Sequence, residues 1–348
     1  MLNKKNAIIE RLNSLYFSDV QSVKKLPLSE SDKYVVFSDL HLGNGGTADN
    51  FVHNKSSMVS ALKYYLDNDF SIILLGDIEE FWQFDYNEIR KKYDKSIYEL
   101  LKNFPDNKVH RVYGNHDKEW AGLFDPISDK ADMPFGDPEG ILLDDYIFLV
   151  HGHQGDILSE KKAWSSRFWV RNYRKIEHFI RIIGSGDPAA TKSQIPKDRE
   201  KVYYEWAKTN KKILICGHTH RAIFASRSYY KWLNEQIQLK QAEKKQTSLD
   251  KAARKKLSKK IKELKARRKR EKKKGRDINP LEESGKLLPC YFNTGSGVYS
   301  KGITSIEIEK TKIRLIKWYN DGSQEIEKYR KSLWQDDDLI AFKETLGI

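Results

Sequence analysis

Five short clusters of carboxylates, imidazoles and one amide have the composition of a site for two divalent metal ions. They are Asp39-Leu-His41, Gly76-Asp77, Gly114-Asn115-His116-Asp117, His151-Gly152-His153 and Gly217-His218-Thr219-His220. Oxygen and nitrogen ligands without a thiolate suit Mn²⁺, Fe or Zn²⁺, and we expect Mn²⁺. Each cluster alone has an ordinary structural explanation, such as an Asp that caps the next helix. All five together, in this order, predict a dinuclear metal site.

Every cluster follows a short apolar run that is typical of a buried β-strand. These runs span residues 33–38, 71–75, 108–113, 146–150 and 212–216, and a sixth spans 289–292. Helical patterns at residues 58–68 and 87–103 separate the first three runs, which favours an α/β fold with crossover helices. Because such sheets place their sites outside the carboxyl ends of strands, the clusters should meet at one edge. The patterns also predict a helix within residues 4–16, a hairpin of residues 302–309 and 312–319, and a weak helix that ends at Ile348.

A first long interruption, residues 156–211, is predicted to be mostly helical. Apolar residues recur at near-helical spacing from Trp164 to Ile183, with Arg residues among them. Aromatic and basic residues interleaved on a helix suit contact with a lipid or a membrane surface. A helix packed on the body, with solvated Arg at its margins, explains the same pattern.

A second interruption, residues 231–276, carries nearly all of the excess charge. The chain has a formal net charge of +14, and this segment alone holds fifteen Lys and five Arg against four Glu and one Asp. A capping box at residues 247–250 and a narrow apolar stripe predict a helical hairpin. The stripe consists of Ala253, Leu257, Ile261 and Leu264. Its cations could bind nucleic acid or anionic lipid, or the hairpin could be solvated or oligomerising.

Cysteine content and hydropathy favour a soluble protein in a reducing compartment. The two cysteines, Cys216 and Cys290, lie in predicted strands and are expected to be small buried hydrophobic residues. They are too few for a disulfide framework and lack the spacing of a zinc site. No segment approaches about 18 consecutive apolar residues, and the N-terminus lacks a signal-peptide pattern. We therefore expect a cytoplasmic protein without a transmembrane segment.

The ordered clusters resemble the pattern of the calcineurin-like metallophosphoesterase superfamily, over residues 33–220. Residues 293–296, Asn-Thr-Gly-Ser, are similar to the loop that follows the last motif in many members. The resemblance implies a sandwich of two mixed β-sheets flanked by helices. Its metallophosphoesterase domain would comprise residues 1–230 and 277–348, with residues 156–211 as a lid-like helical insertion and residues 231–276 as the inserted basic hairpin.

The resemblance also implies a role for each polar residue of the clusters. The first metal would be bound by Asp39, His41, Asp77 and His220. The second would be bound by Asp77, Asn115, His151 and His218, so that Asp77 bridges the two ions. His151 is preferred because it comes directly off its strand, and His153 stays an alternative. His116 would lie beside the phosphate without binding metal, and Asp117 would fix its tautomer.

The second motif narrows the substrate class. It reads Gly76-Asp77-Ile-Glu-Glu80-Phe-Trp82 and lacks the Arg with which phosphoprotein phosphatases bind a monoester. The spacing is similar to that of UDP-2,3-diacylglucosamine hydrolases, which also insert a helical lid between the fourth and fifth motifs. Their main branch has Arg where this chain has His116, so the resemblance implies a relative of those enzymes.

Three hypotheses follow. The favoured one is a dinuclear metal phosphoesterase in which an activated water attacks phosphorus in a phosphodiester or pyrophosphate that is nucleotide-linked or lipid-linked. The second is a nuclease that holds its substrate with the basic hairpin. The third is a non-catalytic binding scaffold, which the complete set of ligand residues disfavours.

Overall fold

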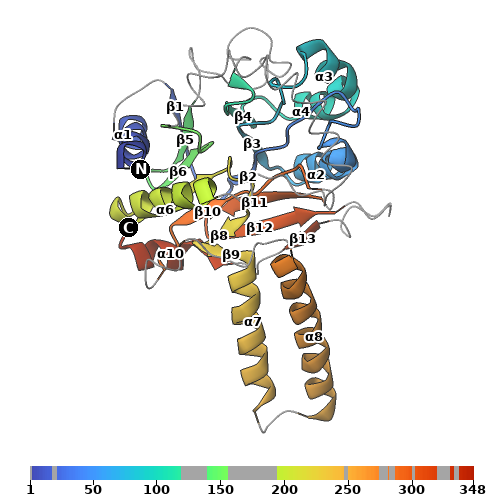
Figure 1. Cartoon of the computed structure of the whole chain (residues 1–348), viewed down its shortest axis with the longest axis vertical. Helices are drawn as coiled ribbons and strands as arrows, with labels where there is room; N and C mark the ends of the chain where they lie inside the picture. Colours follow the sequence, from blue (N-terminus) through green and yellow to red (C-terminus); the bar gives the residue numbers. More distant parts are fainter. Residues whose placement is uncertain are drawn as a thin grey trace.

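The computed structural model is a sandwich of two mixed β-sheets with helices on both outer faces (Figure 1). It describes residues 2–17, 22–118, 139–155, 194–246, 250–273, 281, 287–299, 302–319, 330–332 and 337–348. Each sheet contains seven of the described strands. This architecture confirms the predicted fold class.

One sheet is built around three parallel strands whose carboxyl ends lead to the first three clusters. These are β2 (Lys33–Phe37), β3 (Ser71–Leu75) and β4 (Val109–Val112). The hairpin of β11 (Ile303–Glu309) and β12 (Lys312–Trp318) extends this sheet, because β11 pairs antiparallel with β2. Two short strands, β13 (Arg330–Ser332) and β14 (Asp337–Asp338), pair with β12.

The other sheet carries the last two clusters. Its strand order is β1 (Val23–Leu26), β5 (Gly140–Leu143), β6 (Ile147–Val150), β7 (Ile213–Cys216), β10 (Tyr291–Asn293), β8 (Ile223–Phe224) and β9 (Arg227–Ser228). β6, β7 and β10 run parallel to one another. The ends of β6 and β7 therefore deliver their loops to the same edge.

Alternation along the strands explains how the two sheets pack. In β2, Tyr34 and Val36 belong to the core shared with the other sheet, whereas Val35 and Phe37 belong to the core under the outer helices. Successive side chains of a strand point to opposite faces, so one buried run serves two cores. The sequence shows this as an almost uninterrupted apolar stretch.

Helices cover the two outer faces. α1 (Leu2–Phe17) and α6 (Gln194–Thr209) pack on the sheet that contains β6 and β7. The other sheet is covered by α2 (Lys55–Asp67), α3 (Tyr86–Tyr93), the π-helical segment η2 (Asp94–Tyr98) and α4 (Glu99–Lys102). A 3₁₀ turn, η1 (Val52–Asn54), precedes α2, and α10 (Leu339–Leu346) lies near the C-terminus.

Two helices leave the sandwich as a projecting arm (Figure 1). α7 (Tyr229–Lys244) and α8 (Lys251–Lys273) lie side by side and extend away from the sheets. Leu233, Ile237 and Leu264 form a small core between them. Of the predicted stripe, Ile261 and Leu264 are buried, whereas Ala253 and Leu257 are half-buried.

Most of the predicted elements that fall on described residues are confirmed, with two differences. The single helix predicted at residues 87–103 is wrong, because Lys95 leaves helical geometry and a π-helical segment separates α3 from α4. The short strands β1, β5, β8, β9, β13 and β14 were not predicted. The helix predicted from Trp164 to Ile183 and the start of the capping box at Thr247 lie outside the described residues. No described helix combines the length and the apolar composition needed to cross a membrane.

Candidate metal centre

All five clusters lie directly after the carboxyl ends of strands. Asp39 follows β2, Asp77 follows β3 and Asn115 follows β4, while His151 follows β6 and His218 follows β7. Backbone hydrogen bonds tie the loops to one another: the Asp39 amide donates to the Gly76 carbonyl (3.0 Å) and the Gly217 amide to the His151 carbonyl (2.8 Å). Each of these bonds joins two loops of one sheet, and the His218 amide donates across to the Asp39 carboxylate (2.9 Å), so the two sheets contribute to one site.

Several residues of these loops adopt left-handed backbone conformations. The φ angles are 53° at Asp39, 53° at His41, 52° at Asp77, 64° at His218 and 56° at His220. Such conformations cost about 1–3 kcal/mol for residues other than Gly and cluster at functional sites. The strained backbone turns each of these side chains out of the strand direction.

One group of side chains combines Asp39, His41 and His220. His220 Nε2 lies 3.1 Å from Asp39 Oδ1 and 3.2 Å from His41 Nε2. One ligand atom from each residue falls within 4.8 Å of the others. Asp77 borders this group, since its Oδ2 is 3.9 Å from His41 Nε2.

A second group combines Asp77, His151 and His218. His151 Nε2 lies 3.1 Å from the same Asp77 oxygen, and the His151 and His218 ring centroids are 5.3 Å apart. The ligand atoms of this group also lie within 4.8 Å of one another. Asp77 therefore stands between the two groups, in the position expected of a bridging carboxylate.

Buried polar atoms in this region fit a bound cation. Within the described part of the chain, Asn115 Oδ1 is buried and has no hydrogen-bond partner. Buried polar atoms are nearly always paired, and a bound ion is one of the few explanations for an exception. Carboxylate oxygens, an amide oxygen and imidazole nitrogens are ligands suited to Mn²⁺, Fe or Zn²⁺.

Two glycines allow the loops to approach this closely. A Cβ atom on Gly76 would lie 2.5 Å from His151 Nδ1 and 2.7 Å from the Gly114 amide. A Cβ atom on Gly114 would lie 2.5 Å from the Asp77 backbone nitrogen. Any side chain at either position would therefore push the metal-binding loops apart.

Glu80 forms hydrogen bonds with both His41 and His116. Its Oε2 lies 2.7 Å from His41 Nδ1, and its Oε1 lies 2.8 Å from His116 Nδ1. Burial opposes ionisation of Glu80, but His116 and His41 outweigh it and lower the pKa of the carboxyl to about 2. An ionised carboxylate can only accept hydrogen bonds, so both Nδ1 atoms donate to it and both Nε2 atoms face away.

His116 is a partly exposed histidine of the site. Its side chain is 19% exposed, compared with 7% for His41 and 0% for His151. The ring stacks on Trp82, with centroids 3.8 Å apart and an interplanar angle of 23°. His116 also belongs to a group of possible ligands with His41 and Asp77. Stacking and the Glu80 hydrogen bond fix the plane and tautomer of this ring.

The expected partnership between Asp117 and His116 is wrong. Asp117 Oδ1 accepts from the Gly114 amide (2.6 Å), and its Oδ2 accepts from the Ile78 amide (2.7 Å). Arg111 lies 3.6 Å from the same carboxylate. Burial raises the pKa of Asp117, although Arg111 opposes the shift. Asp117 is therefore a link between the loops that carry Asp77 and Asn115, and Glu80 is the partner of His116.

The structure separates the two histidines of the fourth cluster. His151 donates from Nδ1 to the Leu75 carbonyl (2.8 Å), which turns Nε2 towards Asp77. His153 is buried nearby, with its ring 5.5 Å from that of His151, and belongs to neither ligand group. Burial and the neighbouring His151 lower the pKa of His153 to about 3. His153 is therefore a neutral neighbour of the site.

The histidines and carboxylates of the two ligand groups shift one another's pKa values. Burial lowers the pKa of His41 and of His151, but Glu80 in the first case and Asp77 in the second outweigh it, so both values rise to about 9. His151 in turn holds the pKa of Asp77 well below its ordinary value in spite of burial. In the metal-free protein, protons on imidazoles thus neutralise the carboxylates that would otherwise hold a cation.

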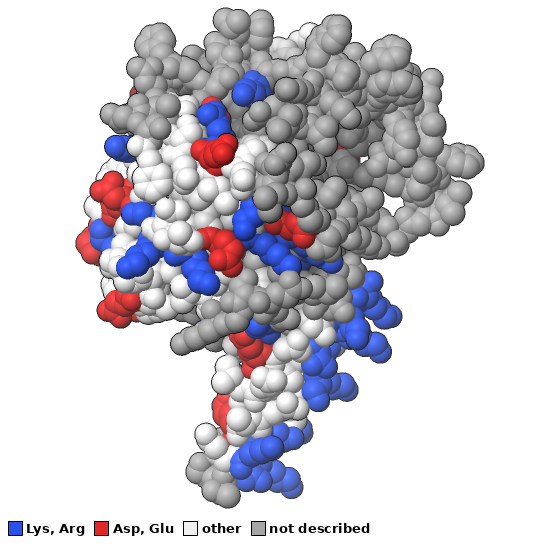
Figure 2. All heavy atoms as spheres, turned by 60° about the vertical axis from the view of Figure 1, so that its left-hand side comes forward, with Lys and Arg blue, Asp and Glu red and all other residues white. Residues whose placement is uncertain are grey.

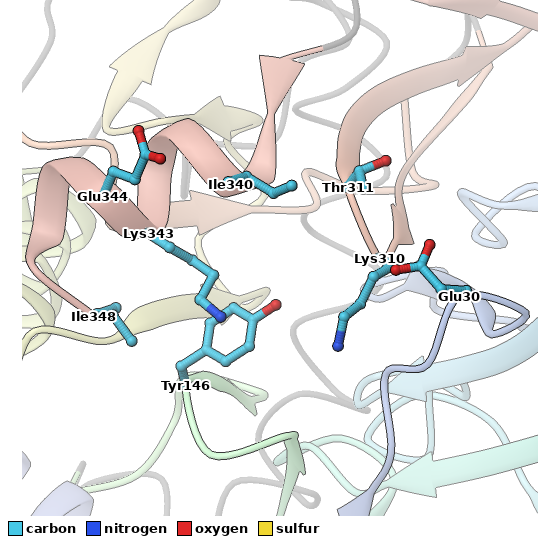
Figure 3. Close-up of a pocket in the computed structure, with 8 residues that line it drawn as sticks. All are labelled: Glu30, Tyr146, Lys310, Thr311, Ile340, Lys343, Glu344 and Ile348. Carbon is cyan, nitrogen blue, oxygen red and sulfur yellow. The ribbon is translucent and has the colours of Figure 1, made fainter.

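A separate depression lies away from these residues (Figure 3). Its volume is about 340 Å³, and its lining includes Tyr146, Lys310 and Lys343. The Lys343 ammonium lies 4.0 Å from the centre of the Tyr146 ring, and Lys310 pairs with Asp144 at 3.4 Å. None of the five clusters lines it, so it is not part of the candidate metal centre.

Comparison with known proteins points to one family. A model of the family described as calcineurin-like phosphoesterase matches residues 33–222. No curated protein matches the chain. A mutant cold-active protein tyrosine phosphatase is 11% identical, with 90% of this chain and 82% of that chain covered and a TM-score of 0.36.

Two further solved structures resemble the chain at similar levels. Vacuolar protein sorting 29 from Cryptosporidium parvum is 13% identical, with 88% of this chain and 97% of that chain covered and a TM-score of 0.34. A protein from Streptococcus pneumoniae described as a predicted phosphoesterase is 12% identical, with coverages of 88% and 98% and a TM-score of 0.29. Similarities this weak add nothing to the family match.

Proposed function

The chain belongs to the calcineurin-like phosphoesterase family and is a metal-dependent phosphoester hydrolase, and we propose that it cleaves a phosphodiester or pyrophosphate bond. The observation that carries this proposal is the position of Asp77 between two groups of ligands. A carboxylate shared in this way can hold two cations close together. Two divalent cations held close together would lower the pKa of a bound water molecule and polarise the phosphoryl oxygens of a substrate.

We assign His116 as the general acid. Its Nδ1 hydrogen bond to Glu80 leaves Nε2 as the ring nitrogen that faces outward, and its partial exposure suits contact with substrate. When the bond to phosphorus breaks, His116 Nε2–H protonates the leaving oxygen, a contribution that is typically about 10²–10⁴ in rate.

The arginines near the site favour a diester or pyrophosphate over a monoester. A monoester dianion needs more positive charge than the metals alone supply, and Arg is the usual donor because its guanidinium matches phosphate geometry. Among the described residues, three arginines lie near the site, and each is buried against the protein itself. Arg111 pairs with Glu79 and Asp117, Arg199 donates to the Gly152 carbonyl at 2.9 Å, and Arg221 lies 3.7 Å from Glu200. The motif after Asp77 contains no Arg. The similarity of this motif to that of UDP-2,3-diacylglucosamine hydrolases supports the same substrate class.

The test compares substrates and metals on the full-length enzyme. Metal-stripped protein is reloaded with Mn²⁺, Zn²⁺ or Fe²⁺ and assayed with bis-p-nitrophenyl phosphate, p-nitrophenyl phosphate and a nucleotide-linked pyrophosphate. We expect Mn²⁺ to restore the highest activity, and the diester or the pyrophosphate to be cleaved faster than the monoester. Asp77→Asn should lose turnover with every metal, whereas Asp67→Asn, an exposed carboxylate change on α2, should not. Faster monoester cleavage would contradict the assigned substrate class.

A further inference from the structure

The arm formed by α7 and α8 carries a strongly positive surface that the metal centre does not use. α8 contains ten Lys and four Arg against two Glu. Twelve of these fourteen cations are exposed, and only Arg267 and Arg268 are partly covered. We call these twelve exposed side chains the basic face. Figure 2 shows positive side chains gathered along one side of the projecting arm.

Among the described residues, acidic neighbours do not neutralise the basic face. The acidic residues of α7 pair on their own side, Glu243 with Lys240 (2.7 Å) and Glu235 with Arg227 (3.2 Å). Within the described part of the chain, no exposed Lys of α8 has a carboxylate at ion-pair distance. Like charges three or four residues apart on a helix destabilise it, so this arrangement favours an external polyanion.

Packing between α7 and α8 determines which side of α8 is covered and which side carries the exposed cations. Leu233, Ile237 and Leu264 are buried between α7 and α8, with Trp232 packed against them. Arg268 donates to Asn234 Oδ1 at 2.9 Å across the same seam. The seam occupies one side of α8, so the exposed cations occupy the rest of its circumference. Lys255, Lys259, Lys262 and Lys269 recur at spacings of four, three and seven residues, which places them on one side of the helix.

The composition of this surface favours nucleic acid over a membrane. Every exposed residue of α8 is Lys, Arg, Glu or Ala, so the surface has no large apolar side chain to enter a bilayer. It also has no aromatic side chain on which an unpaired base could stack. Lysine ammoniums without aromatics are suited to the phosphates of a duplex, which carry no sequence information.

The dimensions agree with a duplex. A helix of 23 residues is roughly 35 Å long at 1.5 Å per residue, which is about one turn of B-form DNA. Double-stranded DNA carries about one negative charge for every 1.7 Å of its axis, so several cations of α8 can meet phosphates at once. We propose that the basic face of the arm binds double-stranded nucleic acid through its phosphates. This proposal goes beyond the hydrolysis proposed above and does not depend on it.

The test measures binding of a labelled duplex of about 24 base pairs and mixed sequence by fluorescence anisotropy, in EDTA so that no metal-dependent cleavage occurs. The logarithm of the association constant should fall linearly with the logarithm of the salt concentration. If six or more phosphates are contacted, the affinity should fall by about 10³-fold or more between 50 and 200 mM salt. The full-length variant Lys255→Gln/Lys259→Gln/Lys262→Gln/Lys269→Gln should bind much more weakly. Its salt dependence should be shallower by about one unit for each lost contact. Gln keeps helix propensity close to that of Lys, and circular dichroism checks that the arm still folds.

The matched control removes the same number of positive charges from the exposed surface of the body. It carries Lys25→Gln, Lys63→Gln, Lys91→Gln and Lys102→Gln. This control should bind the duplex with nearly wild-type affinity and salt dependence. Equal affinity and slope for the two variants would overturn the proposal. So would binding of the wild type to phosphatidylglycerol vesicles but not to the duplex, because the partner would then be a membrane surface.

Discussion

Glu80→Gln is the substitution that most directly tests how the site is organised. The wild-type carboxylate accepts one hydrogen bond from His41 Nδ1 and one from His116 Nδ1, at 2.7 and 2.8 Å. A glutamine of the same shape has one oxygen and one NH₂ group, so it can accept from only one of these rings. The other ring must turn its Nδ1 lone pair towards the NH₂ group and carry its proton on Nε2.

Both possible outcomes weaken the enzyme. If the proton moves to Nε2 of His41, that atom loses the lone pair needed to bind metal, and loss of such a partner typically costs about 10–100-fold in metal affinity or activity. If His116 is the ring affected, it loses the hydrogen bond that sets which ring nitrogen faces the substrate, and part of the general-acid contribution of about 10²–10⁴ is lost. We therefore expect one of two losses. Mn²⁺ affinity falls by about 10-fold or more if His41 is affected, or kcat at saturating Mn²⁺ falls by about 100-fold or more if His116 is affected.

Calorimetric titration with Mn²⁺ gives the metal affinity, and assays at saturating Mn²⁺ give kcat. A diester with a poor alkyl leaving group needs protonation more than a p-nitrophenyl ester does, so its kcat should fall further. Glu99→Gln, which removes an exposed carboxylate from α4, is the matched control and should change neither quantity. Metal affinity and kcat both within twofold of wild type would refute the role of Glu80. A fall in kcat that is equal for the two leaving groups, at unchanged Mn²⁺ affinity, would refute the role of His116.

Three further predictions concern the same loops. Without metal, the pKa values of His41 and His151 are raised to about 9. Protonation of these two rings therefore stabilises the metal-free protein fully below pH 6.5, and the stabilisation is lost as the pH rises through 9. Calorimetry should therefore show Mn²⁺ binding that strengthens over this range with proton release, and binding independent of pH would contradict it. Asp117→Asn removes a charged acceptor from two buried amides and should lower the free energy of unfolding by about 1–3 kcal/mol in urea; an unchanged value would show that the link is unimportant. Gly114→Ala should abolish Mn²⁺ binding because its Cβ meets the backbone of Asp77, and wild-type affinity would show that the loops can separate without loss.

The positions of the clusters could be predicted because the signal is local. Each follows a short run of buried residues such as the Ile-Ile-Leu-Leu stretch before Gly76, and a strand that ends in a polar turn is recognisable without its neighbours. Parallel strands of one sheet then bring their carboxyl ends together. Strand β1 shows the limit of this signal. Its sequence, Val-Lys-Lys-Leu, is only half-buried at the edge of its sheet, so it lacks both the apolar run and the clean alternation that identify other strands.

The partner of His116 could not be predicted from adjacency. Asp117 is next to His116 in sequence, but the turn directs its carboxylate back to the amides of Gly114 and Ile78. Glu80 is 36 residues from His116 and 39 from His41, and it reaches both through the contact between the loops. The only trace in the sequence is the spacing of Glu80 after Asp77. That spacing identifies a motif and does not reveal that one carboxylate serves two rings.

The loops of the site hold one another in place. Five of their residues adopt left-handed conformations that cost about 1–3 kcal/mol each, and the surrounding structure must meet this cost. The Gly297 amide donates to the Asp39 carbonyl and the His218 amide donates to the Asp39 carboxylate, so Asp39 connects loops of both sheets. Metal binding must also displace the protons on His41 and His151, so the pH should limit loading of the centre.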